Sequence, residues 1–134
     1  MRAVKDRRGS TRERGAAMVE MAIVLPLLLL LVFGIIEFGR LYNAQVTLTH
    51  AAREGIRDYV IFHDRDQAET VAMDAVSSNF DPTPMGFTTV GCDPGDEPGE
   101  PATMTITYDF DMRIPFIGDS IVRITSDGVM RCGG

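Results

Sequence analysis

The longest apolar run in the chain covers residues 16–36, and its only charged side chain is Glu20. Thirteen of its 21 residues are Leu, Ile, Val or Phe. As a helix the run is about 31 Å long, enough to cross the hydrocarbon core of a bilayer. Insertion of those thirteen side chains contributes about −6 kcal/mol, which outweighs a cost of about +3 kcal/mol for one acid. The pattern therefore predicts a membrane span over residues 16–36.

Helical periodicity continues beyond the span and predicts one long helix over residues 16–63. Apolar side chains, with one polar exception, recur there every three or four residues: Phe38, Leu41, Gln45, Leu48, Ala52, Ile56 and Tyr59. Small residues in the same segment allow another helix to approach closely: Ala44, Ala51, Ala52 and Gly55. A helix of this length far exceeds the globular average, which predicts packing against partners.

Pro26 and Gly34 interrupt the apolar run. Proline removes a backbone donor and bends helices, so both positions are kink candidates. Two interpretations stay open: an ordinary transmembrane kink, or a specific site of local melting.

After the long helix, the sequence predicts a small α+β head over residues 64–134. A second helix starts at Asp66, with Glu69 completing a capping box, and carries an apolar face as far as Phe80. Residues 81–102 are rich in Pro, Gly and acids and are expected to form a loop, with one short strand over Gly86–Gly91.

The strongest strand pattern is Thr103–Met112, in which apolar and polar residues alternate. Its predicted inner face consists of Met104, Ile106, Tyr108, Phe110 and Met112. A turn through Pro115 follows. Then come Ser120–Thr125 and Gly128–Cys132, one strand or a pair, with a hairpin or bulge signal at Ser126-Asp127-Gly128. The predicted sheet is small and antiparallel.

Charge is divided unevenly along the chain. Residues 1–15 carry a net charge of +4, whereas residues 16–134 carry −10. A basic segment directly before an apolar span sets its orientation, with the N-terminus in the cytoplasm and the head outside. The acidic body repels phosphates, which argues against a nucleic-acid partner. A cleaved secretory signal is the alternative, but residues 33–40 offer no Ala-x-Ala-like site.

Cys92 and Cys132 are the only cysteines, and both lie in the part placed outside the cytoplasm. An even pair in an oxidising compartment predicts a disulfide, with two free thiols as the alternative. The two histidines, His50 and His63, face different sides of the predicted helix, and the acids of residues 93–100 lack calcium-loop spacing. We expect no metal, no cofactor and no enzymatic site.

The position of Glu20 requires an explanation, because a carboxylate in lipid is energetically costly. It is a stray acid near the interface, or it pairs with a cation of the same chain, or it pairs between subunits. In the third case the partner is the α-amino group created by a cut between Gly15 and Ala16. We favour the third interpretation, because an amine and a carboxylate satisfy each other in lipid and set the register of neighbouring helices.

Three separated motifs resemble the TadE-like pseudopilins of tight-adherence (Flp-type) type IV pili. They are Arg14-Gly-Ala-Ala-Met-Val-Glu-Met-Ala-Ile-Val-Leu-Pro26, Gly34-Ile-Ile-Glu-Phe-Gly-Arg40 and Ala51-Ala-Arg-Glu-Gly-Ile-Arg57. The resemblance implies a type IV pilin-like fold and a leader, residues 1–15, removed by prepilin peptidase after Gly15. Ala16 is then the mature N-terminus and Glu20 the fifth mature residue.

The function implied is that of a minor pilin in pilus biogenesis, priming, capping or joining the filament. Implied partners are prepilin peptidase, other major and minor pilins, assembly-platform proteins in the membrane, and the lipid bilayer. The implied location is the cytoplasmic (inner) membrane, or the pilus after extraction. The alternative is a permanent single-pass membrane protein whose head binds a ligand or an envelope component.

Overall fold

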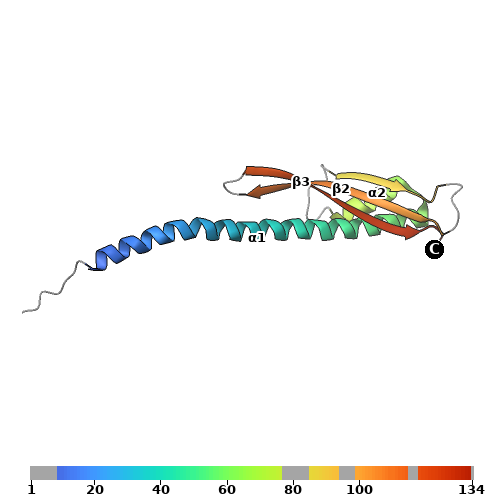
Figure 1. Cartoon of the computed structure of the whole chain (residues 1–134). Coiled ribbons are helices and arrows are strands. Elements are labelled where there is room, and N and C mark those ends of the chain that lie inside the picture. The colour runs from blue at the N-terminus through green and yellow to red at the C-terminus, as the bar shows by residue number, and fades with distance from the viewer. Residues whose placement is uncertain (1–8, 77–84, 94–98, 115–117, 134) are drawn as a thin grey trace, which may run out of the picture.

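The computed structural model describes residues 9–76, 85–93, 99–114 and 118–133. Their order along the chain is two helices followed by three strands: α1 (Gly9–Phe62), α2 (Arg65–Val76), β1 (Met85–Val90), β2 (Pro101–Ile114) and β3 (Gly118–Arg131). Figure 1 shows α1 as a long rod, with α2 and the sheet gathered along its C-terminal half. The α+β, pilin-like architecture predicted from the sequence is confirmed.

Helix α1 starts at Gly9, seven residues earlier than predicted, and ends one residue before the predicted end. The chain leaves it through His63, whose φ of 54° is left-handed and whose N–H donates to the Tyr59 carbonyl at 2.7 Å. This is the αL form of helix termination. The 54-residue helix is far longer than any globular average, as the periodicity indicated.

Helix α2 is capped by Asp64, not by Asp66. The Asp64 carboxylate accepts a hydrogen bond from the Gln67 N–H at 3.1 Å, and the Asp64 carbonyl accepts one from Ala68. Gln67 stands three residues after the cap, the spacing of a capping box. The predicted cap was therefore wrong by two residues, because the short link after His63 leaves Asp64 in the capping position. The predicted end of this helix, at Phe80, falls outside the described residues.

The three strands form one antiparallel sheet in the order β1-β2-β3. Strand β1 pairs with the first half of β2, from Met85↔Tyr108 to Val90↔Thr103. Strands β2 and β3 pair along their whole length, from Pro101↔Arg131 to Ile114↔Gly118. The predicted strands Gly86–Gly91 and Thr103–Met112 are confirmed within a few residues. The predicted inner face of β2 is also confirmed, with Met104, Ile106 and Phe110 buried.

Strand β3 is continuous, so the predicted break at Ser126-Asp127-Gly128 is wrong. Ser126 is buried and accepts a hydrogen bond from Gln45 Nε2 at 2.9 Å. Asp127 faces the other side and accepts a hydrogen bond from the Thr105 hydroxyl at 2.7 Å. At Gly128 a Cβ would collide with the Ala52 backbone of α1. The three turn-like residues therefore serve contacts between β3 and its neighbours.

The core lies between one face of the sheet and the pair formed by α1 and α2. Its fully buried large side chains are Leu48, Ile56, Met104, Ile106 and Val76. Among the small residues of α1, Gly55 admits a helix, and that helix is α2 of the same chain, whereas Ala52 meets β3 at Gly128. At Gly55 a Cβ would collide with Met104 Sδ and would lie 2.9 Å from Ala72 Cβ and 3.0 Å from the Ala68 carbonyl oxygen. Phe38, predicted on the buried stripe, is 67% exposed.

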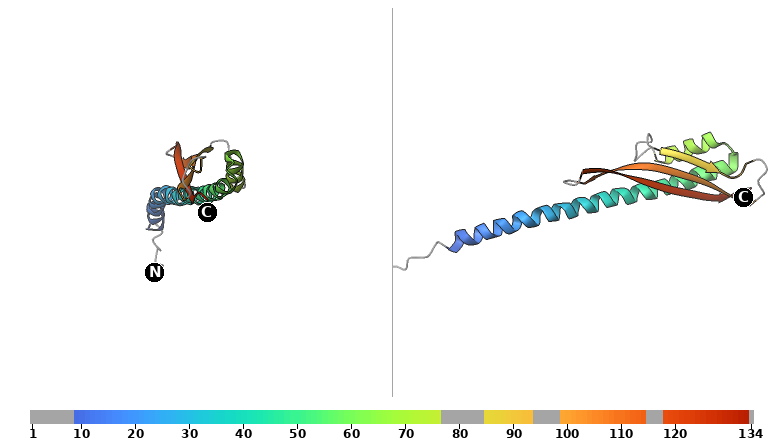
Figure 2. Two further views of the ribbon diagram at one scale, coloured as in Figure 1. Left: turned by 90° about the vertical axis from the view of Figure 1, so that its right-hand side faces the viewer. Right: turned by 45° about the horizontal axis from the view of Figure 1, so that its top comes forward.

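The paired ends of β2 and β3 reach beyond the core and run back along α1 toward its N-terminal half (Figures 1 and 2). We call residues 109–114 and 118–123 the hairpin arm. On its outer face Arg123 and Asp109 form an ion pair at 2.7 Å. The hydrogen bonds from Arg123 hold the pKa of Asp109 below its usual value. The arm brings the sheet alongside the end of the apolar run.

Candidate membrane-anchoring and assembly site

The apolar run of α1 has no cover. Every residue from Arg14 to Ile36 is exposed, including large side chains such as Ile23 and Leu27, each 70% exposed. Of the helices that the structure describes, this is the one whose length and composition suit a membrane crossing. Exposed apolar surface of this extent must be covered by lipid or by other helices.

Gly15, Ala16 and Glu20 lie on consecutive turns of α1, ahead of the leucine-rich part of the run. The space around Gly15 is open, since a Cβ there would meet nothing within 4 Å. Glu20 is exposed, and it makes no hydrogen bond or ion pair with any described residue. The interpretation that Glu20 pairs within its own chain therefore gains no support from residues 9–76, 85–93, 99–114 and 118–133.

Pro26 and Gly34 both lie inside the uninterrupted α1. The helix is one gently curved rod through both positions (Figures 1 and 2). A Cβ on Gly34 would also meet nothing within 4 Å. Their role as kink or melting sites stays a prediction.

Glu37, the residue that follows the run, is the carboxylate that joins α1 to the hairpin arm. Its exposed fraction is 8%. Oε1 accepts a hydrogen bond from Arg40 Nη1 at 2.7 Å, and Oε2 accepts a long one from the Arg113 backbone N–H at 3.5 Å. The Arg40 guanidinium carbon also lies 5.4 Å from the centre of the Phe110 ring. Glu37 and Arg40 of α1 thus contact β2 at the end of the apolar run.

The sequence itself carries a signal for the Glu37–Arg40 pair. Glu37 is the first charged residue after the charge-free stretch 21–36, and Arg40 follows it at the i,i+3 spacing of helical pairs. What the sequence did not provide is the length of the hairpin arm, and without that length nothing shows that the sheet reaches Glu37.

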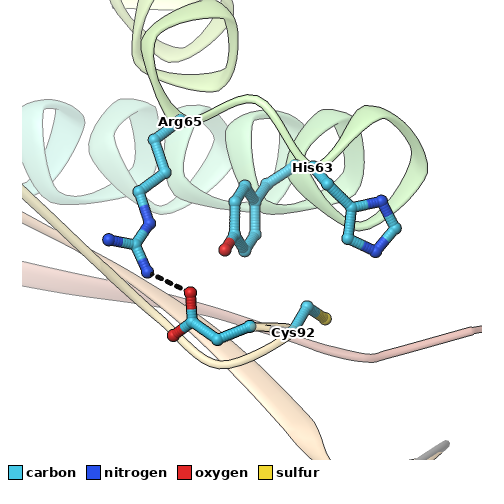
Figure 3. A pocket seen from close by; sticks show the side chains of 5 residues that line it. His63, Arg65 and Cys92 are labelled. Carbon is cyan, nitrogen blue, oxygen red and sulfur yellow. Dashed lines mark hydrogen bonds and ion pairs between the residues drawn. The ribbon is translucent and has the colours of Figure 1, made fainter. Parts of the chain in front are cut away.

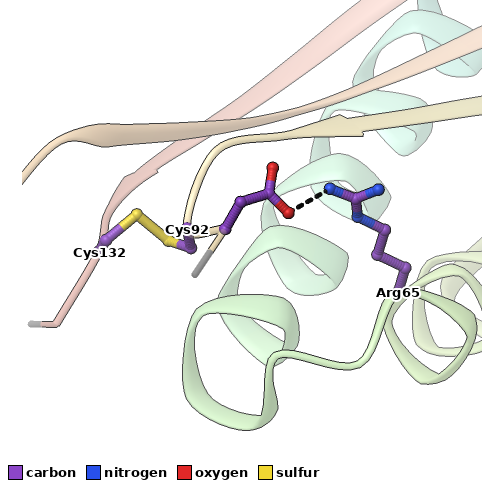
Figure 4. Close-up of a disulfide and its surroundings, with 4 residues drawn as sticks. Arg65, Cys92 and Cys132 are labelled. Atoms are coloured by element: carbon purple, nitrogen blue, oxygen red, sulfur yellow. Dashed lines mark hydrogen bonds and ion pairs between the residues drawn. A yellow bond between two sulfur atoms is a disulfide. The ribbon is translucent and has the colours of Figure 1, made fainter. Parts of the chain in front are cut away.

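The predicted disulfide is confirmed. Cys92 and Cys132 are bonded, with their Cα atoms 5.5 Å apart. Figure 4 shows the bridge at the end of the sheet, where the chain leaves β1 and β3. The Cys132 N–H donates to the Glu100 carbonyl at 2.9 Å, and the Cys132 carbonyl accepts from Gly99 at 3.0 Å. The bridge therefore closes the end of the sheet farthest from the apolar run.

Beside the bridge lies an open hollow of about 380 Å³, lined by Tyr59, His63, Arg65, Cys92 and Asp93 (Figure 3). Arg65 and Asp93 form an ion pair at 2.7 Å across it. The Tyr59 hydroxyl first, and Asp93 second, raise the pKa of Arg65 above its usual value. The cation is thus already neutralised, and the described lining holds no nucleophile with an adjacent base. Nor do any three potential metal ligands converge within the described part of the chain.

Residues 15–57 match the family model for TadE-like proteins. This TadE-like segment makes up about a third of the chain. Neither the search of curated proteins nor that of solved structures found a match.

The match with TadE-like proteins begins at Gly15 and ends within α1. It therefore contains all the candidate assembly residues (Gly15, Ala16, Glu20, Pro26 and Gly34) and the Glu37–Arg40 pair. Helix α2, the sheet and the disulfide lie outside it. The similarity to TadE-like proteins is thus confined to the long helix, and the head is built onto the C-terminal part of that helix.

Proposed function

We propose that this chain is a minor pilin, or pseudopilin, of a tight-adherence (Flp-type) type IV pilus. It is made as a single-pass protein of the cytoplasmic membrane, with residues 1–15 in the cytoplasm and the head outside. Prepilin peptidase cuts after Gly15, and the mature chain then primes, caps or joins the filament. The observation that carries the proposal is the TadE-like segment itself, which starts at Gly15 and whose apolar run, residues 16–36, is a helix with no cover.

The disulfide supports the placement of the head outside the cytoplasm, because structural disulfides persist in oxidising compartments. TadE-like proteins are in general structural and not catalytic, which supports a structural role for this chain. Energy for extraction and assembly comes from the partner machinery in the membrane.

Cleavage is tested by the pair Gly15→Leu and Gly34→Leu. Both glycines lie in α1 with open space around them, so the two variants perturb the helix alike. In cells with active prepilin peptidase, mass mapping of the terminus should find Ala16 in the unsubstituted chain and in Gly34→Leu. Gly15→Leu should retain residues 1–15. An unsubstituted chain that still starts at Met1 in those cells would refute processing and favour the permanent membrane protein.

Glu20 serves assembly in this proposal, by pairing with the amine of Ala16 on a neighbouring subunit. The Glu20→Ala chain should insert into the membrane and be cut normally, because removal of an acid favours insertion. Its incorporation into pili, measured by immunoblot of sheared filaments, should fall well below that of Glu54→Ala, which removes an exposed acid of the same helix. Equal incorporation of the two variants would remove Glu20 from the assembly contact.

A further inference from the structure

Beyond the apolar run, α1 keeps a ridge of exposed apolar side chains. The ridge consists of Phe38, Tyr42 and Val46, exposed by 67%, 65% and 43%. It continues the run, because Ile35 on the same side is 64% exposed. At 100° per residue, the ridge lies about 140° round the helix from the line of Glu37, Ala44 and Leu48 that meets the sheet.

The exposed apolar surface therefore ends at different positions along α1 on its two sides. On the sheet side the run ends at Glu37, where the hairpin arm covers the helix. On the opposite side apolar exposure continues to Val46, ten residues and about 15 Å beyond Ile36. The apolar surface of α1 thus extends further along one side of the helix than along the other. Such a helix fits a bilayer when it is tilted so that the side with the longer apolar surface faces the lipid.

Beyond the ridge, the same side of α1 carries basic residues. The next turns on the ridge side carry His50, Arg53 and Arg57, all of them exposed. Measured from the mean direction of the two arginines, the nearby acids Glu54 and Asp58 lie about 80° and 120° further round the helix. A cationic side stands out on a body with a net charge of −10. Apolar and aromatic residues followed by arginines match the layers of a membrane surface, from acyl chains to phosphates.

We propose that the ridge Phe38–Tyr42–Val46 is a lipid-docking surface. In the membrane-inserted chain α1 is tilted, the ridge lies in the outer interface of the bilayer, and Arg53 and Arg57 face its anionic phosphates. The sheet is then held on the upper side of the helix, away from the lipid. This proposal rests on the membrane anchoring of the proposed function but not on cleavage or assembly.

The chain contains no tryptophan, so each Trp variant has a single indole emission. The test uses Tyr42→Trp and Val46→Trp in the full chain, reconstituted in phospholipid vesicles. Val129→Trp is the matched control, because Val129 is also an exposed valine but lies on β3, in the sheet that the proposal holds away from the lipid. Mass analysis of the disulfide and circular dichroism verify that each variant keeps the fold.

The two ridge variants should emit further to the blue than Val129→Trp. They should be quenched more strongly by bromine-labelled acyl chains and less by aqueous acrylamide. Emission and quenching equal to those of Val129→Trp would overturn the proposal. So would a blue emission that is insensitive to brominated lipid and is lost when the protein is diluted in lipid, because a second copy would then cover the ridge.

Anionic lipid tests the arginines. Lipid quenching of Val46→Trp should increase when phosphatidylglycerol is added to phosphatidylcholine vesicles, and the increase should vanish in the Arg53→Gln, Arg57→Gln background. An increase that persists without the two arginines would contradict their part in docking. Because the uncut chain is used, a failure here is distinct from a failure of prepilin processing.

Discussion

Glu37 is buried at the end of an apolar helix, a place where an unpaired carboxylate would be costly. Its oxygens are satisfied by Arg40 of the same helix and by the backbone of Arg113 on the hairpin arm. The contact to Arg113 is the part that crosses between elements. Glu37 therefore fixes where along α1 the arm lies, while the hydrophobic core fixes the rest of the sheet.

We predict that Glu37→Ala loosens the hairpin arm without unfolding the head. Loss of one charge-assisted contact of this length costs about 1 kcal/mol, which corresponds to about fivefold faster amide exchange in the arm. Hydrogen exchange with mass spectrometry, in detergent or vesicles, measures it for residues 109–113 and 119–123. Glu54→Ala, which removes an exposed acid of α1, should leave those rates unchanged. Equal acceleration across all three strands would show that Glu37 supports the whole core instead.

At the scale of elements, periodicity predicted what depends on one segment alone. The alternation of β2 identified its buried face, and the helical spacing of Leu48, Ala52, Ile56 and Tyr59 identified that of α1. Features that depend on contacts between segments were missed. Ser126 and Gly128 have turn chemistry in isolation, but Gln45 and the Ala52 backbone give them roles inside a strand. Glu37 was missed in the same way, since its partner arrives from 76 residues away.

Gly55 has α2 and Met104 of β2 directly against it, so it tests how tightly the two helices and the sheet pack. In Gly55→Ala the new methyl carbon would collide with Met104 Sδ and lie 2.9 Å from Ala72 Cβ and 3.0 Å from the Ala68 carbonyl oxygen, so both Met104 and α2 must move. We expect a loss of about 1–3 kcal/mol in the free energy of unfolding, which exceeds the gain of up to about 1 kcal/mol in helix propensity.

Gly39→Ala is the matched control for Gly55→Ala, since it lies in the same helix and its Cβ would meet nothing within 4 Å. It should be neutral or stabilising. Denaturant unfolding of the head in detergent, followed by near-ultraviolet circular dichroism, measures both variants. If Gly55→Ala is as stable as Gly39→Ala, the α1–α2 contact is looser than the structure has it.

At the scale of the whole molecule, the head and the apolar run depend on different environments. The run needs lipid or other helices, because it has no cover of its own. The head depends on a small core and on the Cys92–Cys132 bridge, which lies at the opposite end of the sheet from the Glu37 contact. The head is thus held to α1 near the end of the apolar run and closed by a covalent bond far from that run (Figures 1 and 4).

We predict that the Cys92→Ser, Cys132→Ser chain loses the head but keeps the membrane anchor. The bridge spans 40 residues of sequence, and its removal costs about 4 kcal/mol on the chain-entropy model, a large part of the stability of a small domain. The membrane helix satisfies its own backbone in lipid, so the variant should stay in the membrane fraction while protease digests residues 64–134. Reductant should sensitise the unsubstituted head in the same way and leave the variant unchanged. A variant head as protease-resistant as the unsubstituted one would mean that the core alone suffices to hold the head together.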